Sequence, residues 1–592
     1  MSHPRNRYHF LVSASMSWQS IAAAKKQKQL HSVPKDWVPA SVPNDNNIID
    51  FPRQSGLLTP LELEITEASV ANILQNIASS KWSSVAGKRT LRRLIFIYTL
   101  RKVTTAFYKR AIVAQQLTNC LTEIFVDRAL ARAKELDDHL GKTGHVVGPL
   151  HGLPISLKDQ ISLKGIESTM GYVSWIGKPA EKNAVLVDIL EDLGAVCFVK
   201  TNIPQTLMWG ETFNHVWGRT SNPHNRTLTS GGSSGGEGAL VALKGSPLGV
   251  GSDIGGSIRI PAGLCGTYGF RPSFNRIPYS GCVNSLEGQD SILSVLGPLC
   301  NTLDGLKTFF QAVLSKRPWQ KDPLVIRKQW SEDEYNLVDH GGKDGKLCFA
   351  IMWDNGVIVP DPPVKRGLEF AKKALLAAGH QVIDWKQYKQ KEITLTASAI
   401  WNAGAAEDYN AAAAATGEPV IASMTLITGE PGEEQPLEFR PLEKGSSAYA
   451  LWQVQKTKRD LRQEYLQHWE ETVGQTGTGR PVDAIISPMA PYLAPPHGLN
   501  KNAQYTMWCN LLDYPSVVIP VGFKIDPAID VKQPRTEFLS EEDKEIYERY
   551  DPALYANAPL SFQVVARTME EEAVLAMAKV VDDALNAARA KL

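Results

Sequence analysis

The 592-residue sequence has little net charge and few cysteines, and each shortage excludes a class of function. Its 63 basic and 62 acidic residues nearly cancel, so no overall field would attract nucleic acid or an anionic membrane. The seven cysteines are scattered, odd in number and without a CxxC pair, so neither a disulfide framework nor a zinc site is indicated. We therefore expect reduced thiols, no metal and no organic cofactor.

Long hydrophobic runs and targeting signals are also scarce. The longest apolar run near the start, LIFIY at 94–98, is much too short to cross a bilayer. Residues 1–20 lack the apolar core of a signal peptide. The C-terminal AKL is only loosely similar to the peroxisomal signal SKL. We expect a cytoplasmic protein with no transmembrane segment, and peroxisomal import is the lesser alternative.

The spacing of apolar residues changes along the chain. In 103–142 they recur every three or four residues, which predicts helices. From 148 to 298 short apolar runs alternate with glycine-rich turns and short helices, which favours an α/β sheet. The expected buried strands are PISLK, GAVCFVKT, SPLGVGSD, DAIISP and SVVIPVGF, and MEEEAVLAMAKVVDDALNAA is the expected closing helix. With no repeat or flexible linker, we expect one catalytic domain at 61–592 after an N-terminal extension and wrapping helix at 1–60.

Glycine is unusually dense between Thr229 and Gly266. The stretch does not match a phosphate-binding loop, because neither GxxxxGK[ST] nor a GxGxxG following a strand occurs here. The other use of such a stretch is a group of backbone N–H donors for an oxyanion. Ser257 lies between a predicted strand and a helical turn, where free N–H groups and the helix dipole face one spot. Ser257 is therefore either a nucleophile for a carbonyl carbon or only a helix cap.

A serine nucleophile needs a base, and Lys158 is a better candidate than His215 or His224. The two histidines lie in a loop-like stretch with no pattern that ties them to Ser257. On a strand, Lys158 points away from the apolar face of PISLK. It serves as a base only if burial lowers its pKa from about 10.4 towards neutrality. The alternative is a solvated or salt-bridged lysine at a strand end.

A second serine stands between glycines in GGSSGGEG. Ser234 and Glu237 fit a capping box at the start of a helix, which gives Ser234 a structural role. Ser233, one residue earlier, is then free to relay a proton.

Three segments, GLPISLKD, GGSSGGEGAL and GSDIGGSIRIPAGLCGTYGFRPS, resemble the amidase signature family, and AQQLTNC, GPLHGLPISLKDQ and VKTNIPQTLM resemble its fungal acetamidase-type branch. The resemblance extends from about Trp37 to the last helix. It implies one α/β/α domain with a mixed central sheet of about eleven strands and helices on both faces.

The resemblance also assigns roles to residues. Lys158 matches the catalytic lysine, Ser233 the bridging serine that follows a cis peptide, and Ser257 the acylated nucleophile. Asp253 and Arg259 match positions that brace the nucleophile loop. The remaining matched positions are the substrate-lining Leu207 and the oxyanion-hole amides of Ile254, Gly255, Gly256 and Ser257.

The function implied is hydrolysis of a small-molecule carboxylic amide to the acid and ammonia or an amine, through an acyl-enzyme. Two alternatives stay open: a non-catalytic scaffold member of the family, and an amidotransferase-type subunit. We expect no nucleic-acid partner, and a homodimer is one option. The pocket is expected at 207–213, 401–409 and 489–493, where Trp209, Phe213 and Trp401 suggest an apolar or aromatic acyl group.

Two stretches do not match the family pattern. The insert 87–102, GKRTLRRLIFIYTLRK, separates SSVA from VTTAFYKRA, which would join into one amphipathic helix without it. Since Gly-Lys-Arg can be encoded by a sequence with a typical intron start, we hypothesise a retained intron. The alternative is a genuine insertion that forms a basic surface or membrane-touching element. Residues 1–15 precede MSWQS, which resembles a natural family start.

Overall fold

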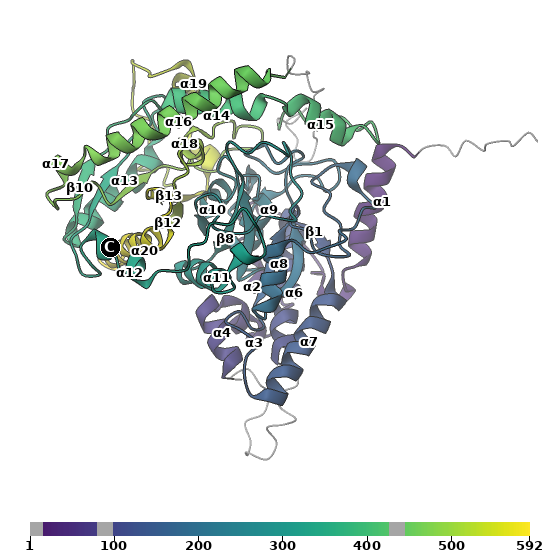
Figure 1. The fold of residues 1–592 in the computed structure, drawn as a ribbon. Helices are drawn as coiled ribbons and strands as arrows, with labels where there is room; N and C mark the ends of the chain where they lie inside the picture. Colours follow the sequence, from purple (N-terminus) through teal and green to yellow (C-terminus); the bar gives the residue numbers. More distant parts are fainter. Residues whose placement is uncertain (1–15, 80–98, 425–444) are drawn as a thin grey trace, which may run out of the picture.

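The computed structural model describes residues 16–79, 99–424 and 445–592 and is built on one eleven-stranded mixed sheet (Figure 1). This confirms the predicted fold class. In spatial order the strands are β1 (Leu121–Ile124), β3 (Val196–Thr201), β2 (Pro154–Lys158), β6 (Leu248–Asp253), β8 (Val295–Cys300), β7 (Tyr268–Arg271), β12 (Ser516–Lys524), β13 (Pro559–Val565), β11 (Ala484–Ser487), β9 (Cys348–Ile351) and β10 (Gln381–Asp384). Two further short strands, β4 (Ser221–Asn222) and β5 (Asn225–Thr229), pair with each other.

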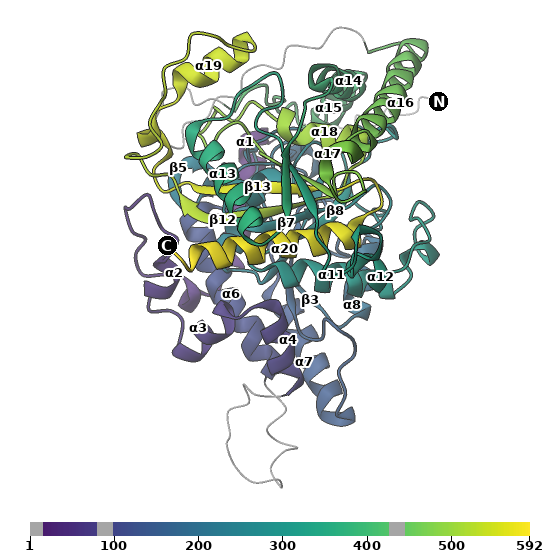
Figure 2. The same ribbon diagram turned by 90° about the vertical axis from the view of Figure 1, so that its left-hand side faces the viewer.

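The helices pack on the sheet and on each other (Figures 1 and 2). They are α1 (Trp18–His31), α2 (Phe51–Gln54), α3 (Pro60–Glu67), α4 (Val70–Ala78), α6 (Thr99–Thr118), α7 (Val126–Thr143), α8 (Val185–Asp192), α9 (Gly235–Ala242), α10 (Arg259–Leu264), α11 (Leu303–Ser315), α12 (Glu332–Tyr335), α13 (Pro362–Ala377), α14 (Gln390–Asn402), α15 (Ala405–Ala413), α16 (Ala448–Glu470), α17 (Val473–Thr476), α18 (Gln504–Leu512), α19 (Glu541–Arg549) and α20 (Glu571–Arg589). Helix α20 contacts β12 and α13, whereas α14 and α16 contact α18. No helix within the described ranges is long and apolar enough to span a membrane.

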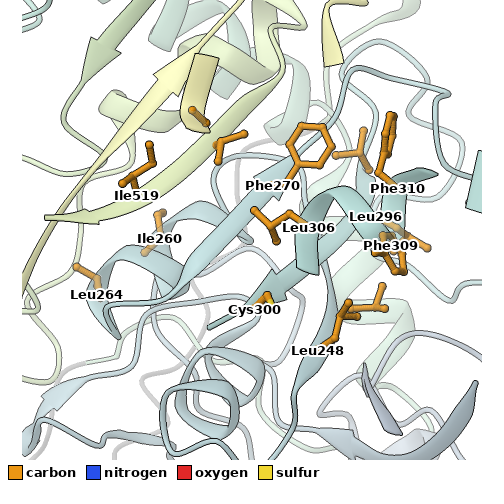
Figure 3. Packing of buried hydrophobic residues seen from close by; sticks show 14 of the residues in the cluster. Leu248, Ile260, Leu264, Phe270, Leu296, Cys300, Leu306, Phe309, Phe310 and Ile519 are labelled. Atoms are coloured by element: carbon orange, nitrogen blue, oxygen red, sulfur yellow. The ribbon is translucent and has the colours of Figure 1, made fainter. Parts of the chain in front are cut away.

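The strands that position the site lie at the centre of the sheet. β2 is parallel to both β3 and β6, and every residue of these three strands is buried. Strands covered on both faces read as continuous apolar runs, which is why their sequences predict them correctly. Around β6, β7 and β8 the core is filled by apolar side chains, including Leu248, Phe270, Leu296 and Phe310 (Figure 3).

The predicted helical region 103–142 contains one strand that the periodicity missed. Helix α6 ends at Thr118, Asn119 adopts a left-handed φ of 55°, and β1 follows at the sheet edge. β1 pairs antiparallel with β3, with Leu121 opposite Thr201. The helical prediction for 103–142 was therefore wrong at β1, because pairing with a distant strand outweighs a short local pattern.

The N-terminal helix α1 attaches to this edge strand. The Gln29 amide donates two hydrogen bonds of 2.8 Å, one to each carbonyl of Leu121 and Thr122. The Lys25 ammonium pairs with Glu123 at 2.5 Å and with Glu167 at 3.2 Å. Helix α1 thus covers β1, which would otherwise be an open edge.

The 87–102 insert lies partly within the described chain. Its residues 87–98, like residues 1–15 and the expected junction with SSVA, fall outside the described residues. Residues 99–102 form the first turn of α6, and Leu100 is completely buried. The N–H groups of Leu100 and Arg101 donate to the Asp137 carboxylate at 3.0 and 3.3 Å, so these four residues are integrated into the fold.

Candidate active site

Ser257 lies in the turn between β6 and α10, as expected from the sequence. It is 8% exposed and lines a cavity of about 330 Å³. Gly256 beside it has a φ of 132°, and a Cβ on this residue would lie 2.3 Å from Thr506 Oγ1. Only glycine fits such a position, so the turn requires its glycine next to the serine.

Lys158 ends β2 and is completely buried. Its Nζ lies 2.7 Å from Ser233 Oγ and 2.8 Å from Ser252 Oγ. Burial lowers the pKa of Lys158 to about 7, although the nearby carboxyl groups of Asp253 and Glu237 favour the charged form. A substantial share of this lysine is thus the neutral amine at neutral pH, and the alternative of a solvated lysine does not hold.

Ser233 is 1% exposed and its hydroxyl contacts Lys158. The peptide bond from Gly232 to Ser233 is cis, and Gly232 lines the same cavity as Ser257. The N–H of Ser234 donates to the carbonyl of Ser257 at 3.2 Å. The two serine-bearing turns are therefore bonded directly to one another.

The capping box predicted for Ser234 and Glu237 is wrong. Ser234 does precede α9, but its side chain makes no cap hydrogen bond; its hydroxyl donates instead to the Ser252 carbonyl at 3.3 Å. Glu237 accepts from Ser156 Oγ at 2.6 Å and from Thr201 Oγ1 at 3.0 Å. Complete burial raises the pKa of Glu237 to about 8, against the effect of these two hydrogen bonds.

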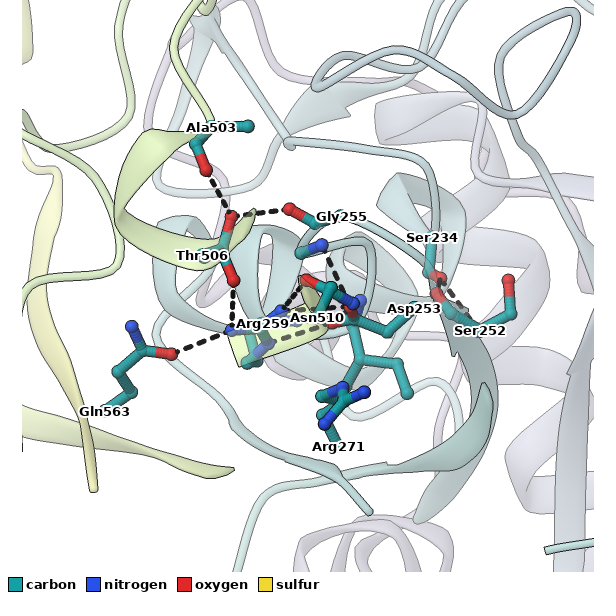
Figure 4. Close-up of polar contacts among 12 residues, drawn as sticks. Ser234, Ser252, Asp253, Gly255, Arg259, Arg271, Ala503, Thr506, Asn510 and Gln563 are labelled. Carbon is teal, nitrogen blue, oxygen red and sulfur yellow. Dashed lines mark hydrogen bonds and ion pairs between the residues drawn. The ribbon is translucent and has the colours of Figure 1, made fainter. Parts of the chain in front are cut away.

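Asp253 and Arg259, which flank Ser257 in the sequence, form a buried ion pair (Figure 4). Arg259 donates from Nε to Asp253 Oδ2 and from Nη2 to Asp253 Oδ1, both at 3.0 Å. Distant residues complete the network: Arg259 also donates to the Thr506 carbonyl, to Gln563 Oε1 and to Asn510 Oδ1 at 3.0, 3.1 and 2.6 Å. Although burial alone would raise it, the charge of Arg259 holds the pKa of Asp253 well below its usual range.

The four backbone amides expected to form an oxyanion hole are not equivalent. The N–H of Gly256 donates to Asp253 Oδ1 at 2.9 Å, so it is engaged in holding the turn. Among the described residues, none accepts a hydrogen bond from the N–H groups of Ile254, Gly255 or Ser257. Three donors therefore remain available beside the cavity.

The cavity is lined mainly by apolar and aromatic side chains. Leu207, Trp209, Trp401 and Tyr409 lie where the sequence predicted them. Phe213 and residues 489–493 are not among the described residues that line it; Phe213 packs with Ile421 and Met424, and Met489 packs in the core behind α10. Ile421 and Met507 also line the cavity, and the sequence around them carries no signal that predicts this. The lining also includes Thr206, Met208, Gly210, Ile260, Ser398, Asn402 and Ala503.

The two histidines set aside as bases are structural. His224 Nε2 lies 3.1 Å from the Cys265 carbonyl, and His215 Nε2 lies 3.1 Å from the Pro419 carbonyl. Burial lowers the pKa of both rings to about 4. Neither histidine lines the cavity beside Ser257.

The fold and site together define an α/β enzyme with an apolar cleft over a serine-bearing turn. A family model described as Amidase matches residues 102–575, and the chain therefore belongs to the amidase family of amide-hydrolysing enzymes. It is 41% identical to an acetamidase of Emericella nidulans and 40% identical to an acetamidase of Aspergillus oryzae, covering 95% and 96% of this chain and 98% of each relative. A solved structure of a fatty acid amide hydrolase superposes with a TM-score of 0.84 at 32% identity, over 96% of this chain and 95% of that one.

Proposed function

We propose that this enzyme hydrolyses a small carboxylic amide through an acyl-enzyme on Ser257, with Ser233 and Lys158 as the proton relay. The observation that carries the proposal is the 2.7 Å contact between the buried amine of Lys158 and Ser233 Oγ. The residue after Ser233, Ser234, donates its N–H to the carbonyl of Ser257 at 3.2 Å, and Ser257 lines the cavity.

In the first step Ser257 Oγ bonds to the amide carbon. Its proton passes to Ser233, whose own proton passes to the neutral Lys158. When the tetrahedral intermediate breaks its carbon–nitrogen bond, the relay returns a proton to the leaving nitrogen, which departs as ammonia or an amine. Water then repeats the same path and releases the acid, leaving all three side chains as they began.

The negative charge on the carbonyl oxygen is stabilised by the free N–H groups of Ile254, Gly255 and Ser257. Each such donor contributes a factor of about 10² to 10³ to the rate when it is aimed at the developing charge. Gly256 holds the turn in shape through Asp253, and Leu207, which also lines the cavity, contacts the substrate.

The substrate that best fits the cavity has an apolar or aromatic acyl group. Trp209, Trp401 and Met507 offer contact area that acetamide alone cannot fill. The alternatives are less well supported. A non-catalytic scaffold has no need of a buried amine with a pKa lowered to about 7. An amidotransferase-type subunit that acts on charged tRNA would be expected to carry a basic surface, and the balanced charge of the chain does not indicate one.

The test is the intact mass of the protein after treatment with a fluorophosphonate. Wild type should gain one adduct, and Ser257→Ala should gain none. Ser285→Ala removes another buried serine outside the cavity and should label like wild type. A folded wild type that gains no adduct would refute the hydrolase mechanism and favour the scaffold alternative.

A further inference from the structure

A second hydroxyl contacts the amine of Lys158. Besides Ser233, Lys158 Nζ faces Ser252 Oγ at 2.8 Å and the Ser252 carbonyl at 3.5 Å. A neutral amine has two N–H groups and one lone pair, and only the lone pair can receive a proton. The proposed relay therefore works only when that lone pair faces Ser233 and not Ser252.

The side chain of Gln160 determines which way Ser252 points. Its amide nitrogen donates to the Val283 carbonyl at 3.0 Å and contacts the Tyr279 hydroxyl at 2.7 Å. A carbonyl can only accept, so the nitrogen must lie on that side and Gln160 Oε1 must face Ser252. The two oxygens lie 2.5 Å apart. Because Oε1 also only accepts, Ser252 must donate its hydrogen to Gln160.

The orientation of the Lys158 amine follows from this. With its hydrogen committed to Gln160, Ser252 Oγ can only accept from Lys158, and so can the Ser252 carbonyl. These two acceptors take the two N–H groups, and the lone pair is left for Ser233. We propose that Gln160 is a positioning residue that, through Ser252, turns the lone pair of neutral Lys158 towards Ser233.

This inference rests on the proposed function, and it adds no proton transfer through Gln160. Replacing Gln160 by methionine frees the Ser252 hydroxyl to donate to the Lys158 lone pair. That contact blocks transfer from Ser233 and also stabilises the neutral amine over the ammonium. The charged and titratable groups that face Lys158, namely Asp253, Glu237 and Cys282, are unchanged by this exchange of one neutral side chain for another.

The experiment measures the rate constant for labelling of Ser257 by a fluorophosphonate, on the full-length chain, from about pH 5 to about pH 9. Gln160→Met should lower the plateau rate about tenfold, the equivalent of one hydrogen bond to the reacting amine. The fall of the labelling rate on the acid side of the pH–rate profile (the acid limb) should also move to lower pH. A plateau within about twofold of wild type, or a limb that stays in place or moves upward, overturns the proposal.

A double-mutant cycle separates positioning from packing. In a Ser252→Ala background the competing hydroxyl is gone, so Gln160→Met should have no further effect on the plateau or the limb. Additive losses would mean that Gln160 only packs, and would overturn the proposal. Gln29→Met, which likewise removes two hydrogen bonds from a buried amide, should label like wild type.

The proposal can still be tested if Gln160→Met does not fold, and its failure can be told apart from failure of the proposed function. If Gln160→Met fails to fold, Ser252→Ala alone decides, because the ammonium of Lys158 loses an acceptor and the acid limb must move to lower pH. An unmoved limb in that variant refutes the role of Ser252 and therefore of Gln160. If wild type is not labelled at all, the proposed function itself fails; if it is labelled and Gln160→Met matches it, only this inference fails.

Discussion

Arg259 donates two hydrogen bonds of 3.0 Å to the Asp253 carboxylate, and both side chains are completely excluded from solvent. The same carboxylate accepts from the N–H of Gly256 at 2.9 Å and from that of Ile258 at 3.1 Å. The ion pair therefore fixes the backbone on both sides of Ser257. Its function is to hold the shape of the turn, since neither side chain lines the cavity.

Removing one partner of this ion pair should destabilise the protein strongly. Arg259→Met leaves the Asp253 carboxylate buried without its ion-pair partner, which costs about 3–5 kcal/mol. The thermal unfolding midpoint checks this, with Lys134→Met as the control because Lys134 pairs with Asp138 on the exposed surface. A midpoint for Arg259→Met that equals the control's would contradict the structural role of the pair.

Much of the site could be predicted from the sequence because its parts are local. PISLK and SPLGVGSD are continuous apolar runs that become fully buried strands, and the glycines around Ser257 mark a tight turn. The bracing network could not be predicted in the same way. Thr506, Asn510 and Gln563 reach Arg259 from about 250 to 300 positions further along the chain, and no spacing rule connects such distant segments.

The strands missed by the sequence analysis have a similar explanation. β7, β8, β9, β10 and β13 are stabilised by pairing partners that are distant in sequence, as when β13 pairs with both β11 and β12. β1 has an apolar pattern that also fits a helix. Tertiary pairing decides such cases, which is why the sheet's strand count could be anticipated only from family resemblance.

The pKa of Lys158 predicts how the reactivity of Ser257 depends on pH. Because Lys158 must be neutral to accept a proton and its pKa is lowered to about 7, labelling by a fluorophosphonate should rise with pH through about 7 and level off above it. Below that value the rate should fall about tenfold per pH unit. A rate that is flat between about pH 5 and pH 8 would rule out Lys158 as the base.

Replacing Lys158 should strongly slow this labelling whether or not the charge is kept. Lys158→Met removes the base, and Lys158→Arg introduces a group that stays protonated, so both should label at least about 10²-fold more slowly. Lys200→Met is the matched control, because Lys200 is equally buried on the adjacent strand and donates to Ser168 Oγ at 2.6 Å. Rapid labelling of folded Lys158→Met would show that another group is the base.

Glu237 should make stability fall as pH rises. Burial raises its pKa from 4.5 to about 8, so between these values the folded state holds a proton that the unfolded state has lost. Unfolding then becomes easier with increasing pH across that window. Glu237→Gln mimics the protonated acid and should remove this part of the pH dependence while the protein stays folded. Thermal midpoints of both proteins from about pH 5 to pH 8 test it; parallel curves would mean that Glu237 is ionised in the fold.

Trp401 should decide how strongly the enzyme prefers apolar acyl groups. Its ring lies against the Ser257 turn, with Cη2 only 3.3 Å from where a Cβ on Gly255 would lie, and it is 7% exposed. An acyl group entering the cavity must contact this ring, whereas the methyl of acetamide buries little area there. Trp401→Ala should therefore lower kcat/KM for phenylacetamide about tenfold or more, and change that for acetamide much less. Trp452→Ala, which removes an exposed tryptophan, should alter neither. Equal losses for both substrates would place Trp401 in support of the turn and not in recognition of the acyl group.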